Sequence, residues 1–134
     1  MNITIKGRTI MKGNVQAEAI VSKTPLSLTY INPDTGAVDD STQELNGQII
    51  KGKILVLPAL KGSAQQPFSL YQLVRNGVAP QGLIALEADA RLMAAALFCD
   101  IPLMDELQKN PLEVISSGDI VHLNADRGVV EVQK

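Results

Sequence analysis

The sequence predicts an α/β fold, with a short parallel sheet at its core and an added antiparallel β layer. Apolar runs of strand length at residues 53–57 and 82–86 are each followed by apolar residues at helical spacing. Strands that alternate with helices form parallel sheets through right-handed crossovers. Near the end of the chain, two short strands at residues 120–123 and 129–132 flank the turn Asp126-Arg127-Gly128, which predicts an antiparallel hairpin at a sheet edge.

The composition predicts one globular domain over residues 1–134 and excludes several classes of function. The 134 residues are enough for one buried core, and 46% hydrophobic against 19% charged residues indicates a folded chain. The formal net charge is −2 without a basic run, and only 3% of the residues are aromatic. A nucleic-acid surface or an anionic membrane surface is therefore not expected.

Cysteine usage predicts a reducing compartment. Cys99 is the only cysteine, so the chain forms no internal disulfide and, with one histidine, no cysteine-rich metal site. The first ten residues lack signal-peptide character, and no apolar run approaches the roughly 20 residues of a membrane span. We therefore expect a cytoplasmic protein with no membrane partner.

The N-terminal segment predicts two strands. Residues 4–11 contain the spaced isoleucines Ile5 and Ile10, with Gly7 and Gly13 as punctuation, and residues 15–22 alternate apolar and polar side chains. Lys12-Gly13-Asn14 between them is typical of a hairpin turn.

Residues 24–49 form a connection that is longer than a routine loop and rich in turn residues. Its apolar residues predict that it packs on the core; they are Leu26, Leu28, Tyr30, Ile31, Val38 and Leu45. Long ordered connections in compact domains are often functional. Asp39 and Asp40 suggest a metal, but adjacent loop carboxylates are more often solvated or bonded within a turn, so no metal ligand is assigned.

The central unit is a strand, a loop and a helix. Residues 53–57 have the length and composition of a strand buried on both faces, and Pro58 ends it because proline has no N–H to donate. Residues 66–74 place Phe68, Leu70, Tyr71 and Val74 at helical spacing. Open α/β sheets usually bind ligands at the carboxyl ends of such strands, which points to the loop between these two elements.

That loop supplies the candidate binding residues Lys61, Gly62, Ser63 and Ala64. Gly62 permits a close approach of the backbone to a ligand, and the start of a helix favours an anion. Ser63 then presents a hydroxyl beside that anion. The same residues have a plainer interpretation, because Gly-Ser before a helix is also an ordinary turn and N-cap, and a loop lysine is usually solvated.

A second strand–helix unit follows. After the strand at residues 82–86, Asp89 caps a predicted helix over residues 90–98, and residues 101–104 form another strand. The apolar side of this helix comprises Leu92, Met93, Ala96 and Leu97. Cys99 is predicted to be a buried small hydrophobe, and His122 a strand residue without a catalytic partner nearby in sequence.

A set of short segments in a fixed order resembles a known family. In order these are Lys6-Gly7-Arg8, Glu18-Ala19-Ile20-Val21-Ser22, Pro25-Leu26-Ser27, Pro33-Asp34-Thr35-Gly36, Gly47-Gln48-Ile49-Ile50-Lys51-Gly52-Lys53, Leu55-Val56-Leu57-Pro58, Lys61-Gly62-Ser63, Asn76-Gly77-Val78-Ala79-Pro80 and Ile101-Pro102-Leu103. This series resembles the swivel-domain small subunit of the aconitase X family, and within it the archaeal phosphomevalonate dehydratases. The resemblance extends from Ile5 to the C-terminal hairpin.

The resemblance implies a swivelling β/β/α fold and a separate large subunit that carries an iron–sulfur (4Fe–4S) cluster. It implies that Ser63 is the proton acceptor, and that Lys61, Gly62 and Ala64 contact the substrate. The implied reaction is the dehydration of (R)-5-phosphomevalonate to trans-anhydromevalonate 5-phosphate, by a heterodimer in a modified mevalonate pathway of isoprenoid biosynthesis.

Two loops differ from the family pattern and leave alternatives open. Thr29-Tyr30-Ile31 replaces a double glycine, and Ala64 to Pro67 replace further serines and glycines. A dehydratase for another hydroxy acid, such as cis-3-hydroxy-L-proline, and a non-catalytic binding subunit are the alternatives. A phosphohistidine swivel domain is a further one, but it needs a histidine on a mobile loop, whereas His122 lies in a predicted strand.

Overall fold

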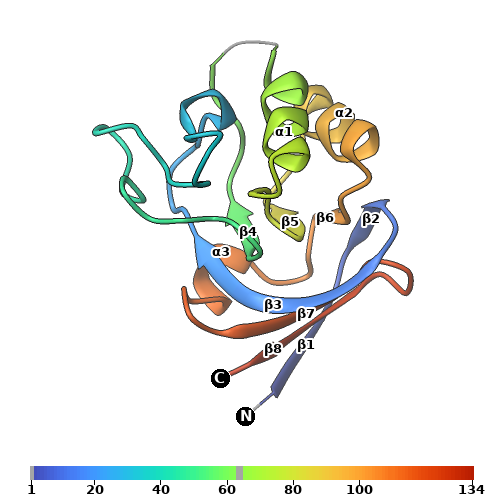
Figure 1. Cartoon of the computed structure of the whole chain (residues 1–134). Coiled ribbons are helices and arrows are strands. Elements are labelled where there is room, and N and C mark those ends of the chain that lie inside the picture. The colour runs from blue at the N-terminus through green and yellow to red at the C-terminus, as the bar shows by residue number, and fades with distance from the viewer. Residues whose placement is uncertain (1, 63–64) are drawn as a thin grey trace.

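The computed structural model describes residues 2–62 and 65–134 and contains strands, two longer helices and two short helical segments (Figure 1). The elements are β1 (Asn2–Lys6), β2 (Arg8–Met11), β3 (Asn14–Val21), η1 (Leu28–Tyr30), β4 (Ile54–Leu57), α1 (Gln66–Arg75), β5 (Gly82–Ala85), α2 (Ala90–Cys99), β6 (Leu103–Asp105), α3 (Pro111–Val114), β7 (Ile120–Asn124) and β8 (Val129–Gln133).

The strands form one mixed sheet in the order β1-β8-β7-β3-β4-β5-β6-β2. Strands β3, β4, β5 and β6 are parallel to one another, whereas β1, β8, β7 and β3 pair antiparallel. Figure 1 shows α1 and α2 together on one side of the parallel strands, with the antiparallel layer on the opposite side. The predicted α/β fold class, with its parallel core and added β layer, is confirmed.

The parallel strands are buried on both faces, as their continuous apolar runs predict. Leu55 and Leu57 of β4 pack with the helices and the connection 24–49, whereas Ile54 and Val56 pack with the antiparallel layer. The neighbouring strand repeats the division, with Leu83 on the helical side. Two apolar cores therefore lie on either side of one thin sheet, which gives the β/β/α layering.

The N-terminal prediction of one strand followed by a hairpin is wrong. Residues 4–11 divide at Gly7 into β1, which pairs with β8, and β2, which pairs with β6 at the opposite edge of the sheet. A side chain at Gly7 would lie 2.2 Å from the Leu107 side chain and 3.0 Å from the Asp105 carbonyl, so only glycine fits at this crossing. Because β1 covers β8, the C-terminal hairpin is not at an edge either.

Helices α1 and α2 exist as predicted, but the faces that they bury differ from the expected ones. In α1 the buried residues are Gln66, Leu70 and Leu73, while Phe68 is 67% exposed. Tyr71 and Val74 are exposed as well. The buried face of α1 begins with the polar residue Gln66. A prediction based on apolar residues alone therefore chose the adjacent face of the helix. In α2 the buried residues are Leu92, Ala95 and Ala96, so Leu97 is also on the exposed side.

The connection 24–49 is ordered and packed, as its apolar residues predict. It contains η1 and three isolated bridges, of which Leu26–Leu60 ties it to the chain after β4. Its buried apolar residues are Leu26, Leu28, Ile31, Val38 and Leu45. Tyr30 departs from the prediction, since its ring is exposed. In the part of the chain that the structure describes, no helix is long and apolar enough to cross a membrane.

The burial in α2 leads to a direct test with two matched substitutions in one helix. Leu92 is 1% exposed and Leu97 is 56% exposed. Leu92→Ala should lower the free energy of unfolding by about 2–5 kcal/mol, because it removes buried methyl groups and leaves a cavity. Leu97→Ala should change it by about 0.5 kcal/mol or less. Urea denaturation of the purified chain measures both, and equal losses would contradict the assigned face.

Candidate functional site

The candidate site lies at the carboxyl ends of the parallel strands, where the sequence placed it. A cavity of about 390 Å³ is bordered there by the residues that follow β4, β5 and β6. Its lining consists of Pro58, Ala59, Leu86, Glu87, Ala88, Asp89 and Glu106. Lys61 and Gly62 follow β4 at the same end and are exposed, whereas Ser63 and Ala64 lie outside the described residues.

Helix α1 begins later than the N-cap interpretation of Ser63 requires. Its N-cap residue is Gln65 and its first residue is Gln66, so Ser63 precedes the cap by two positions. The interpretation of Ser63 as an N-cap of α1 is therefore wrong. Pro67 occupies the first turn and has no N–H, so α1 offers one amide donor fewer to an anion than most helix starts do.

Three consecutive carbonyl groups after β4 are each bonded to a side chain from a helix. Arg91 donates from Nη2 to the carbonyl of Leu60 (3.0 Å) and from Nη1 to that of Gly62 (2.6 Å). Gln66 donates from Nε2 to the carbonyl of Lys61, which lies between them. The backbone of residues 60–62 is thus held from α1 and α2 at once.

Gln66 is fully buried and joins three parts of the site. Its Oε1 accepts a hydrogen bond from the Leu28 N–H (2.7 Å), at the start of η1. Its Nε2 is bonded to the loop, and its backbone starts α1. A buried amide with both ends bonded fixes the separation of its partners, because losing either bond would leave a buried polar group unpaired.

Gly62 is required by both its backbone and its surroundings. Its φ of +99° is in a region that L-residues rarely adopt. A Cβ there would lie 3.3 Å from Gln66 Nε2 and 3.4 Å from Ser27 Oγ. Any side chain at this position would therefore press on the groups that hold the loop.

Arg91 is itself held by Asp89. Asp89 Oδ2 accepts from Nε (3.0 Å) and Nη2 (2.8 Å) of Arg91, while its Oδ1 accepts from the Leu92 N–H (3.0 Å). The predicted cap of α2 by Asp89 is confirmed, and the same carboxylate has a second role that the sequence did not indicate. Burial opposes ionisation of Asp89, but these hydrogen bonds and the Arg91 charge outweigh it and lower its pKa.

A second ion pair, between Arg8 and Asp105, is bonded to two residues of the cavity lining, Ala88 and Glu106. Arg8 Nε and Nη2 donate to the two oxygens of Asp105, each at 2.8 Å, and the Ala88 N–H donates to Oδ2 at 2.7 Å. The Asp105 side chain is 0% exposed, whereas Arg8 is 46% exposed and also lies 2.9 Å from Glu106. Burial would raise the pKa of Asp105, yet the hydrogen bonds from Arg8 and Ala88 and the Arg8 charge lower it.

Sequence reasoning missed the roles of Gln66, Arg91 and the Arg8–Asp105 pair. The one usable signal was Asp105 itself, because a carboxylate directly after a buried strand needs a cationic partner. Nothing in the sequence indicates that this partner is Arg8, which lies 97 positions away.

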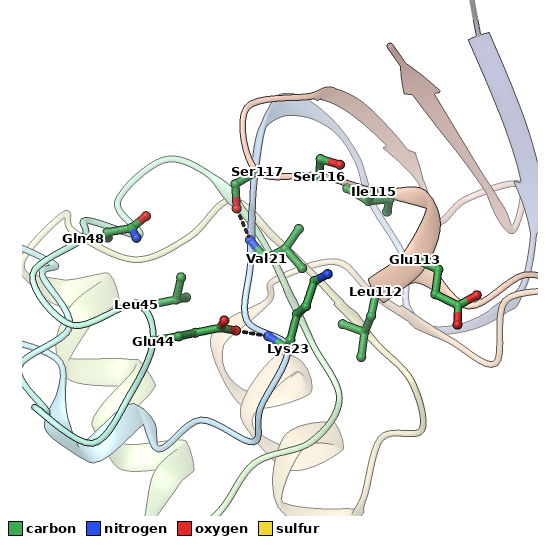
Figure 2. A pocket seen from close by; sticks show the side chains of 10 residues that line it. All are labelled: Val21, Lys23, Glu44, Leu45, Gln48, Leu112, Glu113, Ile115, Ser116 and Ser117. Carbon is green, nitrogen blue, oxygen red and sulfur yellow. Dashed lines mark hydrogen bonds between the residues drawn. The ribbon is translucent and has the colours of Figure 1, made fainter.

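A separate hollow of about 390 Å³ lies between the connection 24–49 and the segment around α3 (Figure 2). Figure 2 shows two of its polar groups bonded to backbone N–H groups: Ser117 Oγ accepts from Val21 (2.9 Å), and Glu44 accepts from Lys23. These side chains are occupied in joining segments. These two polar groups are therefore less available to a ligand, and we place the candidate site at the carboxyl edge of the sheet instead.

The other candidate residues have structural partners. His122 lies in β7, within contact of Asn14 and 3.9 Å from Glu131, so it is not on a mobile loop as a phosphohistidine carrier requires. Asp40 Oδ1 accepts from the N–H (3.0 Å) and hydroxyl (2.6 Å) of Thr42 within a turn. Cys99 is half-buried instead of fully buried, and burial raises its pKa.

Residues 2–62 and 65–134 contain no group of three or more His, Cys, Asp or Glu side chains that could hold a metal.

Comparison with known proteins relates this geometry to a family. The model of the aconitase X swivel domain matches residues 4–132. The phosphomevalonate dehydratase small subunit of Methanosarcina acetivorans is 41% identical over 98% of this chain and 92% of its own length. That of Thermococcus kodakarensis is 40% identical over 96% and 95%. The crystal structure of Thermococcus kodakaraensis aconitase X (holo-form) matches with a TM-score of 0.92 and 37% identity, over 98% of this chain and 99% of that one.

The Arg8–Asp105 pair predicts an acid-dependent loss of stability. Because the folded-state pKa of Asp105 is lowered, its contribution is complete above the unfolded-state pKa of about 3.9 and is lost as pH falls through the folded-state pKa. Asp105→Asn should lower the free energy of unfolding by roughly 1.5–3 kcal/mol at pH 7, and the difference from wild type should shrink below about pH 4. Urea denaturation across this pH range measures it.

Glu106→Gln is the matched control, because Glu106 also contacts Arg8 but is 52% exposed. Its effect should be small at every pH. A difference between Asp105→Asn and wild type that stays constant down to pH 2 would contradict the assigned titration.

Proposed function

Because the chain belongs to the aconitase X swivel-domain family, we propose that it is the small subunit of a two-subunit hydro-lyase that dehydrates (R)-5-phosphomevalonate to trans-anhydromevalonate 5-phosphate. The observation that carries this proposal is similarity along the whole chain: relatives with the name phosphomevalonate dehydratase small subunit align over 96–98% of it. That similarity favours this substrate over another hydroxy acid. It also favours a dehydratase subunit over a binding subunit without activity.

A large subunit is needed for the reaction, since this chain cannot hold the cluster that the family implies. An iron–sulfur cluster of the 4Fe–4S type is held by cysteine thiolates, and Cys99 is the only cysteine in the sequence. We therefore assign the cluster to the large subunit, where its iron would supply a Lewis acid for the leaving hydroxyl. The chain's own contribution is the loop after β4.

We propose that Ser63 is the proton acceptor. Its Oγ would take the proton from the carbon beside the substrate carboxylate; the electrons of that C–H bond form the double bond, and the hydroxyl on the next carbon leaves with the electrons of its C–O bond. A serine hydroxyl needs a lowered pKa for this role. In this proposal, the positive end of α1, which begins three residues later in the sequence, and the charge of Lys61, two residues earlier, would stabilise the ionised serine.

The charges around the cavity suggest how substrate binding is divided between the subunits. Three carboxylates, those of Glu87, Asp89 and Glu106, line the cavity beside the loop. Arg91 pairs with Asp89, and Arg8 pairs with Asp105 and Glu106. Since Arg8 and Arg91 are already paired with these carboxylates, neither is free to bind a phosphate, and we propose that Lys61, Gly62 and Ala64 contact the reacting end of the substrate. The large subunit would then supply the cations for the phosphate.

The assignment extends to the setting in which the enzyme works. We propose that residues 1–134 act as one swivel domain, that the surface facing the large subunit includes the connection 24–49 and the loop 60–66, and that the enzyme is cytoplasmic. A lone thiol such as Cys99 remains reduced in that compartment.

The first prediction from this proposal concerns assembly. The purified chain alone should show no dehydration of (R)-5-phosphomevalonate, because it has one cysteine and no ligand set for the cluster. Co-expression with a cluster-carrying large subunit should yield a complex that co-purifies and turns over. Size-exclusion chromatography and an assay of product formation measure both properties. Turnover by the metal-free chain, or no association with any candidate large subunit, would contradict the proposal.

The second prediction concerns Ser63. Ser63→Ala in the assembled enzyme should lower kcat by about 10²–10⁴-fold, the usual contribution of a positioned base. Since Gln65 holds the N-cap position of α1, the melting temperature should change little. Ser69→Ala is the control, because Ser69 lies within α1, one turn beyond its start, and its hydroxyl makes long contacts of 3.4–3.5 Å. Near wild-type turnover of Ser63→Ala would refute the catalytic assignment.

A further inference from the structure

Arg91 connects α2 to the segment that follows β4. Its Nη1 and Nη2 donate to the carbonyls of Gly62 and Leu60, at 2.6 Å and 3.0 Å. Two carbonyls separated by one residue require two donors in a fixed relative position. A planar guanidinium provides this fork, and a lysine ammonium on a flexible stem does not.

The position of this fork is set by the start of α2. Asp89 caps the helix through Oδ1 and binds Nε and Nη2 of Arg91 through Oδ2, at 3.0 Å and 2.8 Å. The carboxylate offsets the charge of the guanidinium, so Arg91 adds little field to the cavity. The main contribution of Arg91 is therefore structural, because its hydrogen bonds fix residues 60–62 relative to α2.

On the basis of the proposed function of Ser63, we infer that Arg91 is a positioning residue of the dehydratase. By holding the carbonyls of Leu60 and Gly62, it fixes the backbone that leads directly into Ser63. Without the fork, the Leu60 and Gly62 carbonyls lose these hydrogen bonds; Gln66 still holds the Lys61 carbonyl, so the change is concentrated at Gly62, whose backbone is the freest to move. A displacement of about 1 Å at a catalytic group can cost about 10²-fold in rate.

The kinetic test uses the complex with the large subunit. Arg91→Lys, which keeps the charge and removes the fork, should lower kcat by about 10–100-fold, because the misplaced group acts on the bond-breaking step. KM should change by less than about threefold, since Arg91 does not touch the substrate. Arg75→Lys is the matched control: Arg75 is exposed at the other end of α1, and its kcat should stay within about twofold of wild type.

A double-mutant cycle separates positioning from an independent effect. If Arg91 acts through Ser63, Arg91→Lys added to Ser63→Ala should lower the residual kcat by no more than about threefold. If the two effects multiply instead, Arg91 acts by another route and the inference is overturned.

An NMR measurement on the isolated full chain reports on the clamp without using activity. Arg91→Lys should shift the amide signals of Lys61 and Gly62, and Asp89→Asn should shift them in the same direction. Asparagine still caps α2 but cannot pair with the guanidinium. Unchanged signals in both variants would overturn the inference.

The failure of this inference can be distinguished from the failure of the proposed function. A wild-type complex that turns over while Arg91→Lys keeps normal kcat contradicts the positioning role alone. A wild-type complex without any turnover contradicts the dehydratase assignment, and the positioning role in catalysis with it.

Discussion

Strand β3 connects the two halves of the fold, and the layered structure depends on its two pairings. Along its first part it pairs antiparallel with β7, and at residues 19–21 it pairs parallel with β4. Ile20 therefore faces the helical core, while Ala19 and Val21 face the antiparallel layer. A strand with period-two alternation can serve two cores only if both sides of it are apolar, as they are here.

At the carboxyl edge of the parallel strands, buried polar groups contribute to holding the segments together, in addition to apolar packing. Gln66 and Asp105 are both fully buried, and each is bonded to more than one segment. Within the described residues, every buried side-chain nitrogen and oxygen has a hydrogen-bond partner. A bonded polar group in a low-dielectric setting holds its partners more specifically than an apolar contact, because a misplaced partner leaves a desolvated dipole or charge. The loop after β4 is thus determined by hydrogen bonds more than by packing.

Under the proposed function, the chain presents the loop after β4 to a larger subunit and does not enclose the substrate by itself. Its cavity at the carboxyl edge is lined by carboxylates and apolar residues, and Arg8 and Arg91 nearby are already engaged in ion pairs. All four aromatic side chains of the chain, those of Tyr30, Phe68, Tyr71 and Phe98, are exposed, and the last three form ring contacts on α1 and α2. Such a distribution is consistent with one half of an active site that is completed by another subunit.

The sequence alone determined most of the elements and their order, but not η1, α3 or the division of the first strand into β1 and β2. Continuous apolar runs, the Asp89 cap and the C-terminal hairpin each follow from local chemistry, and the choice of the loop after β4 as the candidate site follows from the rule for parallel strands. The tertiary structure decided which strands pair, which helix faces are buried and which polar groups meet. The division at Gly7 depends on a crossing with Leu107, and the Arg8–Asp105 pair joins residues that are 97 positions apart. The buried stripe of α1 begins with Gln66, whose amide is satisfied only once η1 and the loop lie beside it. Local patterns record hydrophobicity and backbone preference, whereas a hydrogen-bond partner distant in sequence has no local signal.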